Sequence, residues 1–252
     1  MPLIIVRITM KKIYLPIIAS GMFLFSGCAE LQTASQISGI LNQVGGLSGL
    51  SNAQISSGLK EALNLGLSEG ILKLGQKDGF SNNALARILL PQELQGVEKT
   101  LRSVGLGSLA DQGLKLLNTA AEDAVVEAGP IFKNAITTMS FQDATGILMG
   151  GDNAATNYLQ TKTTAQLTAA FQPKVANSLG KVGADKVWSN IITKYNAIAG
   201  KNINPDLNAY VTEQAVKGVF NMVAEKEAGI RNNPNLRTTQ LLQQVFAAQD
   251  KK

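Results

Sequence analysis

The chain has no histidine, and among its 252 residues it has a single cysteine, Cys28. Without histidine, Ser-His-Asp and Cys-His catalysis are excluded, and so are the usual ligand sets of zinc and copper sites. A single cysteine excludes a disulfide within the chain. An enzyme built on this sequence would therefore depend on carboxylates, lysine, tyrosine or a hard metal bound by oxygen atoms, and the sequence indicates no cofactor.

Long apolar runs are also scarce, and the one that stands out covers residues 13–25. Lys11 and Lys12 precede it, and the small residues Ser26 and Gly27 separate it from Cys28. A basic start, an apolar stretch and small residues are the layout of a secretory signal, and a cysteine directly after them makes a bacterial lipobox. The run is too short to span a bilayer, which needs roughly 17–25 residues.

We therefore predict a lipoprotein signal peptide over residues 1–27, with translation starting at Met10, and lipid attachment at Cys28. The alternatives are an ordinary signal with a chance cysteine and a buried structural cysteine. The lipid on Cys28 would anchor the protein in a membrane of the bacterial envelope. Ala29 is not the aspartate that retains many such proteins at the inner membrane. The expected location is thus the outer membrane facing the periplasm, with surface exposure left open.

The signal peptide also accounts for most of the basic character of the chain. Residues 1–27 contain three basic residues and no acidic one, so their removal lowers lysine plus arginine from 23 to 20 against 18 acidic residues. The net charge falls from +5 to +2. The basic residues left are scattered singly, whereas nucleic-acid binding needs a clustered basic surface. We expect no nucleic-acid partner.

Residues 28–50 are rich in glycine, serine, glutamine and asparagine and are expected to form a tether. Within them Ile37, Ile40, Leu41 and Val44 have the spacing of one helical face. The alternative to a plain linker is therefore a short amphipathic helix that lies on the membrane or docks on the domain.

From Ser51 onward the apolar residues follow a helical period, and no segment alternates with the period of a strand. The sequence predicts an all-α fold, with a single compact domain of about 9–11 helices over residues 51–248. We expect Gly129-Pro130 to break a long helix that covers about residues 109–139. Asp152 is expected to cap the start of one helix. Pro173 is expected to interrupt another helix later in the chain.

Several ordered motifs resemble the bacterial domain-of-unknown-function family 4197. They are Gln76-Lys77-Asp78-Gly79-Phe80, Pro130-Ile131-Phe132-Lys133-Asn134-Ala135-Ile136, Ala154-Ala155-Thr156-Asn157-Tyr158, Tyr195-Asn196-Ala197-Ile198, Asn204-Pro205-Asp206-Leu207-Asn208 and the segment 230–239. The resemblance covers roughly residues 50–247. It implies a mostly helical envelope protein, often with a lipoprotein signal, and it assigns neither an activity nor any site residue.

Glu122, Asp123 and Glu127 form the densest acidic group in the sequence. On a helix Asp123 and Glu127 are i, i+4 neighbours, whereas Glu122 points about 100° away from Asp123. Asp123 and Glu127 are therefore candidates for an acid/base pair, if burial raises one pKa. The alternative is a solvated helix edge with lysine partners.

Asp78 is the candidate metal ligand, because the loop at residues 76–83 is rich in oxygen donors. Its spacing is not that of a helix-loop-helix calcium site. The alternative is an Asp-Gly turn that leads into a capped helix.

Gly150 and Gly151 precede a helix start, where backbone N–H groups can bind an anion. The sequence after them is not that of a phosphate-binding loop, and Asp152 would itself occupy the cap and repel phosphate.

Arg231 and Arg237 flank a turn at residues 232–235, and Asp206 lies in an earlier turn. These three are candidates for binding a polar ligand such as a glycan or a carboxylate. Asp206 is an equally good internal partner for an arginine, so bracing between helices is the alternative.

The sequence thus favours a non-enzymatic envelope lipoprotein whose domain binds an envelope protein, an apolar ligand or a cell-wall component. The alternative function is a carboxylate-dependent hydrolase or lyase centred on Asp123 and Glu127.

Overall fold

The computed structural model describes residues 50–247, which all fall within one compact unit. The predictions for the signal peptide, Cys28 and the tether lie outside this range. The described residues contain no strand and form nine α-helices and two short 3-10 helices. The α-helices are α2 (Asn52–Leu74), α3 (Gln95–Ser103), α4 (Gly107–Val125), α5 (Ala128–Thr137), α6 (Phe141–Met149), α7 (Ala154–Gly180), α8 (Ala184–Ala199), α9 (Leu207–Asn232) and α10 (Gln240–Phe246). The all-α prediction is confirmed.

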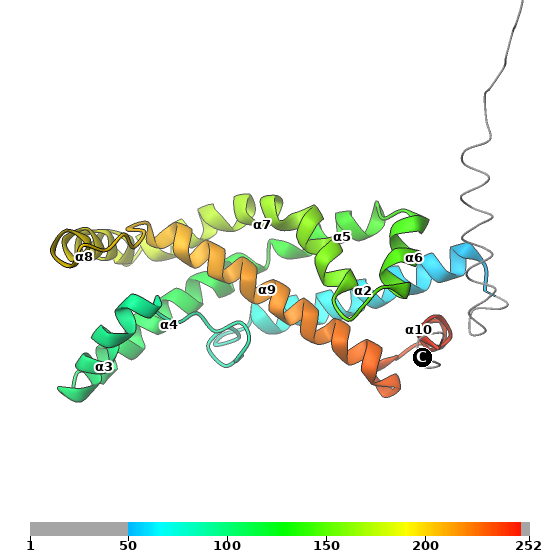
Figure 1. Ribbon diagram of the computed structural model, residues 1–252, viewed down its shortest axis with the longest axis horizontal. Helices are drawn as coiled ribbons and strands as arrows, with labels where there is room; N and C mark the ends of the chain where they lie inside the picture. The colour runs from blue at the N-terminus through cyan, green and yellow to red at the C-terminus, as the bar shows by residue number, and fades with distance from the viewer. Residues whose placement is uncertain (1–49, 248–252) are drawn as a thin grey trace, which may run out of the picture. The chain divides into compact units, whose positions relative to one another are not determined.

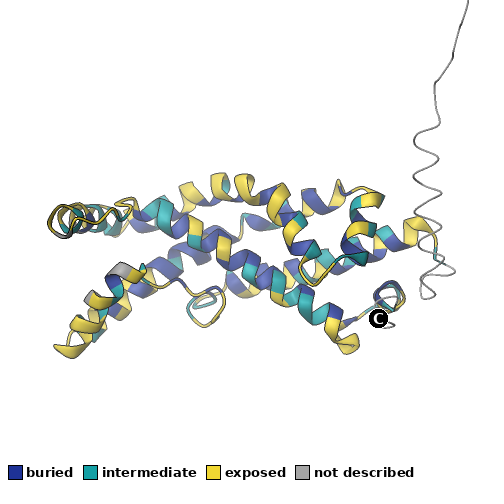
Figure 2. Ribbon diagram, in the orientation of Figure 1, coloured by how far each residue is buried: buried dark blue, intermediate teal, exposed yellow. Residues whose placement is uncertain are grey.

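Three long helices form the centre of the domain, with α7 packed against both α4 and α9 (Figure 1). The helix α9 also crosses α2, and α2 in turn contacts α5, α6 and α10. The buried faces of these helices meet along the middle of the domain (Figure 2). Its largest fully buried side chains include Phe80, Phe132 and Phe171. Among the described residues, no helix is long and apolar enough to cross a membrane.

The helices do not break at the prolines as the sequence predicts. The long helix expected over residues 109–139 breaks earlier, between Val125 and Ala128, and Pro130 stands in the first turn of α5, where a missing N–H costs nothing. The prediction that Pro173 interrupts a helix is wrong, because α7 continues through it. Pro173 and Ala169 are exposed, so the carbonyl of Ala169, which lacks an intrahelical donor, lies on the solvent side of α7.

The segment between α2 and η1 (Gln92–Leu94) has no regular helix and is fixed by side chains of α4 and α9. Asn118 of α4 bonds both the N–H and the carbonyl of Ile88, at 2.8 and 2.9 Å. From α9, the Tyr210 hydroxyl donates to the Leu89 carbonyl at 2.6 Å, and the Asn221 amide donates to the Leu85 carbonyl at 2.8 Å. The segment is therefore part of the packed body.

We predict that Gly79→Ala destabilises the domain by about 2–3 kcal/mol, because the new methyl group would overlap backbone atoms. Its Cβ would collide with the Lys73 carbonyl oxygen and would lie 2.5 Å from that of Leu74. Urea unfolding of the mature chain measures the effect. Gly113→Ala is the control, since a Cβ at Gly113 meets no atom within 4 Å. Equal stability of the two variants would contradict the prediction.

Candidate functional site

In the structure the two members of the candidate acid/base pair each contact a different residue of α7. The Asp123 carboxylate accepts a hydrogen bond from the Ser178 hydroxyl at 2.7 Å, and the Glu127 carboxylate forms an ion pair with Lys174 at 2.7 Å. Asp123 is exposed, and Glu127 lies after the end of α4, as the residue before α5. Both side chains brace α7 from the solvent side. This is the arrangement of a solvated edge with a lysine partner.

Glu122 is the buried member of the acidic group, and it binds the loop that carries Asp78. Its carboxylate accepts the N–H groups of Asp78 and Phe80, each at 3.2 Å. Burial raises the pKa of Glu122, and the hydrogen bonds from the loop N–H groups act against that rise. Glu122 therefore fixes the loop from the inside.

Asp78 itself stands at a left-handed backbone position, with φ of +62°, and its carboxylate lies 3.8 Å from the Lys115 ammonium. A left-handed aspartate before a glycine is the turn that the sequence offered as the alternative to a metal ligand. Within the described part of the chain, no three acidic, cysteine or histidine side chains gather as metal ligands.

The structure does not bring Asp206 to the two arginines. Asp206 caps the N-terminus of α9 by accepting the Ala209 N–H at 3.0 Å, whereas Arg231 lies in the last turn of the same 26-residue helix. Arg237 is buried beyond the helix end, where its guanidinium donates to the carbonyls of Ile230 and Arg231 at 3.1 and 3.0 Å. The two arginines thus brace the C-terminal end of α9.

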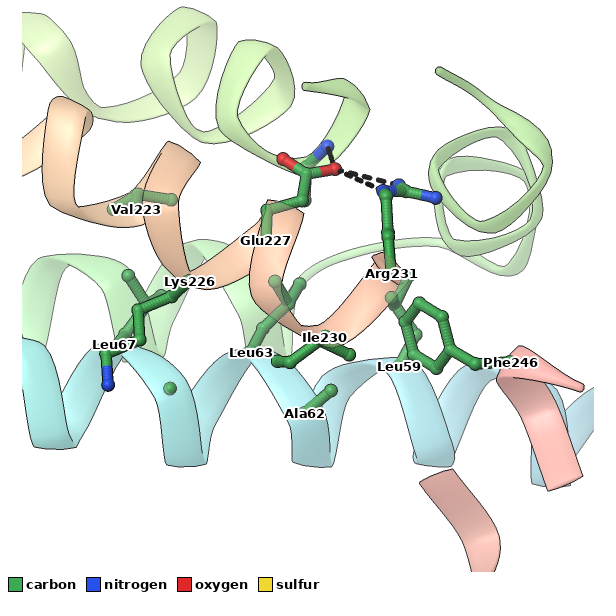
Figure 3. Close-up of a pocket in the computed structure, with 12 residues that line it drawn as sticks. Leu59, Ala62, Leu63, Leu67, Val223, Lys226, Glu227, Ile230, Arg231 and Phe246 are labelled. Atoms are coloured by element: carbon green, nitrogen blue, oxygen red, sulfur yellow. Dashed lines mark hydrogen bonds and ion pairs between the residues drawn. The ribbon is translucent and has the colours of Figure 1, made fainter. Parts of the chain in front are cut away.

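Glu227 and Arg231 form a buried ion pair one turn apart on α9, with 5% of each side chain exposed and 2.7 Å between the charged groups (Figure 3). The Glu227 carboxylate accepts the N–H groups of Ala155 and Thr156 at 2.9 and 2.8 Å, and the Thr156 hydroxyl at 2.8 Å. These N–H groups belong to the first turn of α7. A carboxylate at a helix N-terminus is stabilised by the helix dipole as well as by the hydrogen bonds.

Arg231 performs the complementary task at the preceding helix. Its guanidinium donates to the carbonyls of Ile147 and Leu148, at 2.8 and 3.4 Å, near the end of α6. The i, i+4 pair on α9 therefore caps the end of α6 and the start of α7 together. The prediction that Asp152 caps α7 is wrong, because the N-cap residue is Asn153, it makes no side-chain cap bond, and Glu227 takes the N–H groups instead. The anion site considered at Gly150-Gly151 is filled by the protein's own carboxylate.

Two adjoining hollows lie between α2 and α9, next to this ion pair. The first is a narrow apolar pocket of about 30 Å³ that the apolar side chains of α2, α9 and α10 surround (Figure 3). The second is a wider groove of about 380 Å³ with Leu65, Leu236 and Leu242 in its walls. Both hollows are lined by Ala62, Gly66, Lys226 and Ile230. We define these two hollows together as the α2–α9 groove.

The groove exists because α2 carries small residues at every fourth position: Gly58, Ala62, Gly66 and Gly70. Such a row lets neighbouring elements approach closely. A Cβ at Gly58 would lie 2.7 Å from Val245 of α10, and a Cβ at Gly70 would collide with Met222 of α9. A Cβ at Gly66 would meet no atom closer than 3.9 Å. The ends of the row are therefore filled by the protein, whereas its middle is open.

Neither Glu227 nor the groove was singled out from the sequence. An available signal was the glutamate four residues before Arg231 on a helix, a spacing that favours an ion pair. Another was the four-residue repeat of small residues in α2. Both signals are common in helices, and only the packing of distant segments distinguishes these two.

We predict that Glu227→Gln lowers the free energy of unfolding by about 3 kcal/mol, because Arg231 loses its partner in a buried site. Arg231→Met should cost a similar amount, and the double variant should cost less than the sum of the two. Chemical denaturation of all three variants gives the coupling energy. Glu69→Gln, which breaks the exposed pair with Lys226, is the matched control and should cost less than about 1 kcal/mol. A Glu227→Gln cost as small as the control's would contradict the prediction.

The model of a family described as "Protein of unknown function (DUF4197)" matches residues 49–247. No curated protein and no solved structure matches the chain. The matched range covers most of the chain and contains every helix of the described residues. The chain therefore belongs to the DUF4197 family.

Proposed function

We propose that this protein is a lipid-anchored protein of the bacterial envelope whose helical domain is a non-enzymatic binding module for a linear aliphatic chain. The anchor rests on the sequence around Cys28, where lysines, an apolar run and small residues precede the cysteine. The binding role rests on the α2–α9 groove. An envelope protein or a cell-wall component, the other partners considered, would have to use another surface.

The observation that carries the proposal is the open middle of the small-residue row on α2. Ala62 and Gly66 line both hollows there, and apolar side chains that include Leu59, Leu63 and Phe246 surround the narrow one. The narrow hollow of about 30 Å³ adjoins the wider groove of about 380 Å³, so one extended chain would occupy both. The shape therefore favours an aliphatic chain, lying in the groove with its tip in the pocket.

The polar groups beside the groove support an apolar occupant. Glu227 and Arg231 line the narrow pocket, but their charged groups already bind each other and the ends of α6 and α7. A ligand in the pocket gains nothing from these groups, and a polar one would lose its hydration without compensation. The groove rim carries Lys226 in an ion pair with the exposed Glu69, 3.1 Å apart, so a ligand's polar end would lie there in water.

The carboxylate-dependent hydrolase or lyase gains no support from the geometry. Asp123 and Glu127 each contact α7 from the solvent side, and neither lines the α2–α9 groove. A binding role needs no reacting group.

We predict that Gly66→Ala weakens binding of cis-parinaric acid, a linear fluorescent fatty acid, by about fivefold, because one methyl group would fill the place of a methylene of the ligand. The same change should raise the melting temperature, since alanine favours a helix over glycine by up to about 1 kcal/mol. Fluorescence titration and thermal unfolding of residues 29–252 measure the two effects. All the core residues lie within this mature chain, so it retains the packed body without the lipid.

Gly113→Ala is the matched control for Gly66→Ala. Gly113 is exposed in the middle of α4 and does not line the groove, so its replacement should give the same stability gain and leave binding unchanged. If cis-parinaric acid does not bind the wild-type chain, or if Gly66→Ala binds it as tightly as Gly113→Ala does, the proposed function is wrong.

The anchor gives a separate prediction. Cys28→Ala should prevent lipid attachment and release of the leader by the lipoprotein peptidase. The protein should then lose palmitate labelling and keep the mass of the uncut precursor, as mass spectrometry of the membrane fraction would show. Ser26→Ala is the control, because alanine is also small and leaves the cysteine in place. A Cys28→Ala protein that still carries the lipid would contradict the anchor.

A further inference from the structure

The short C-terminal helix α10 forms a wall of both hollows. Leu242 of α10 lines the wide groove, and Phe246 lines the narrow pocket (Figure 3). We propose that α10 is a lid: its displacement joins the pocket and the groove into one channel, and its return closes this channel over a bound aliphatic chain. The inference rests on the proposed function, since it concerns access to the same site.

The packing of α10 suits a detachable element. α10 has seven residues, and its main packing partner is α2. Leu242, Val245 and Phe246 are buried, so the helix is held by the contacts of one face. An isolated helix of this length is not stable in water, which means that α10 depends on docking for its order. Elements of this kind open at lower free energy than the core of a domain.

The chain before α10 has the features of a pivot. Arg237 is held at the end of α9 by its bonds to the carbonyls of Ile230 and Arg231. The same residue holds α10 in place: the Gln243 amide donates to its carbonyl at 3.1 Å, and its guanidinium lies 5.7 Å from the centre of the Phe246 ring. Between them, Thr239 has an extended backbone and caps α10. Opening thus breaks the contacts of Gln243 and Phe246 while Arg237 stays on α9.

When the lid is closed, α10 packs against Gly58 of α2. An ideal Cβ at Gly58 lies 3.5 Å from the Cβ of Val245, a separation at which two cysteines form a disulfide. Neither Gly58 nor Val245 lines the pocket or the groove. A disulfide between these positions would therefore lock α10 without touching the ligand site. The mature chain from residue 29 has no cysteine of its own to interfere.

The experiment compares the double variant Gly58→Cys/Val245→Cys of residues 29–252 in its oxidised and reduced forms. Stopped-flow fluorescence measures the association rate of cis-parinaric acid. Oxidation should slow association by at least about tenfold relative to the reduced form of the same variant, because the fraction of open molecules falls. Equal rates in the two forms would overturn the lid.

Gly58→Ala gives the opposite change and keeps the test independent of the disulfide. Its methyl group would lie 2.7 Å from Val245 and should displace α10 from α2. Association of the ligand should then become faster than in the wild type. Gly113→Ala again serves as the control for helix propensity. Slower or unchanged association in Gly58→Ala, relative to Gly113→Ala, would count against the lid.

Hydrogen exchange separates failure of the lid from failure of the proposed function. The amides of α10 should exchange at least about tenfold faster than those of α9 in the wild-type chain without ligand. If cis-parinaric acid fails to bind, the proposed function is wrong. In that case the hydrogen-exchange rates still show whether α10 opens. Exchange in α10 as slow as in α9 would overturn the lid even if the acid binds.

Discussion

The buried pair of Glu227 and Arg231 is the interaction on which the arrangement of the C-terminal half of the domain depends. A helix start leaves N–H groups without partners, and a helix end leaves carbonyls without partners. Here one turn of α9 satisfies both kinds at once, with Glu227 on the start of α7 and Arg231 on the end of α6. Each charge also neutralises the other, so two ions are buried without an unpaired one. The turn between α6 and α7 is thereby fixed against a helix far along the chain.

Small residues set the second constraint, because they decide how closely helices approach α2. At Gly58 and Gly70 the neighbouring side chains fill the space that a Cβ would need, and at Gly66 they do not. The α2–α9 groove is therefore a local interruption of otherwise close packing, next to the buried ion pair of Glu227 and Arg231. A site of this kind holds its ligand by apolar contact and shape, which agrees with a chain that lacks histidine and has no cysteine beyond Cys28.

The fold class was predictable because helical periodicity and capping are local properties. Ser51 with Gln54 and Ser140 with Asp143 form the capping boxes that their spacing indicates. The wrong predictions concern places where a distant contact replaces a local one. Asp152 has the right position to cap α7, but Glu227 reaches the N–H groups from another helix. Pro173 lacks an N–H group and could break α7, but the carbonyl that loses its donor faces solvent. The helical turns before and after Pro173 remain packed in the core.

The sequence by itself determined the helical fold, the membership of a family and the absence of thiol and imidazole chemistry from the domain, since these follow from composition and short-range pattern. Only the tertiary structure decided which acidic residue is buried, namely Glu122 and not Asp123 or Glu127, and which residue Arg231 pairs with. It alone placed an open groove at Gly66. Burial and cavities arise from the packing of segments far apart in the chain. The periodicity of one helix does not indicate where its neighbours leave empty space.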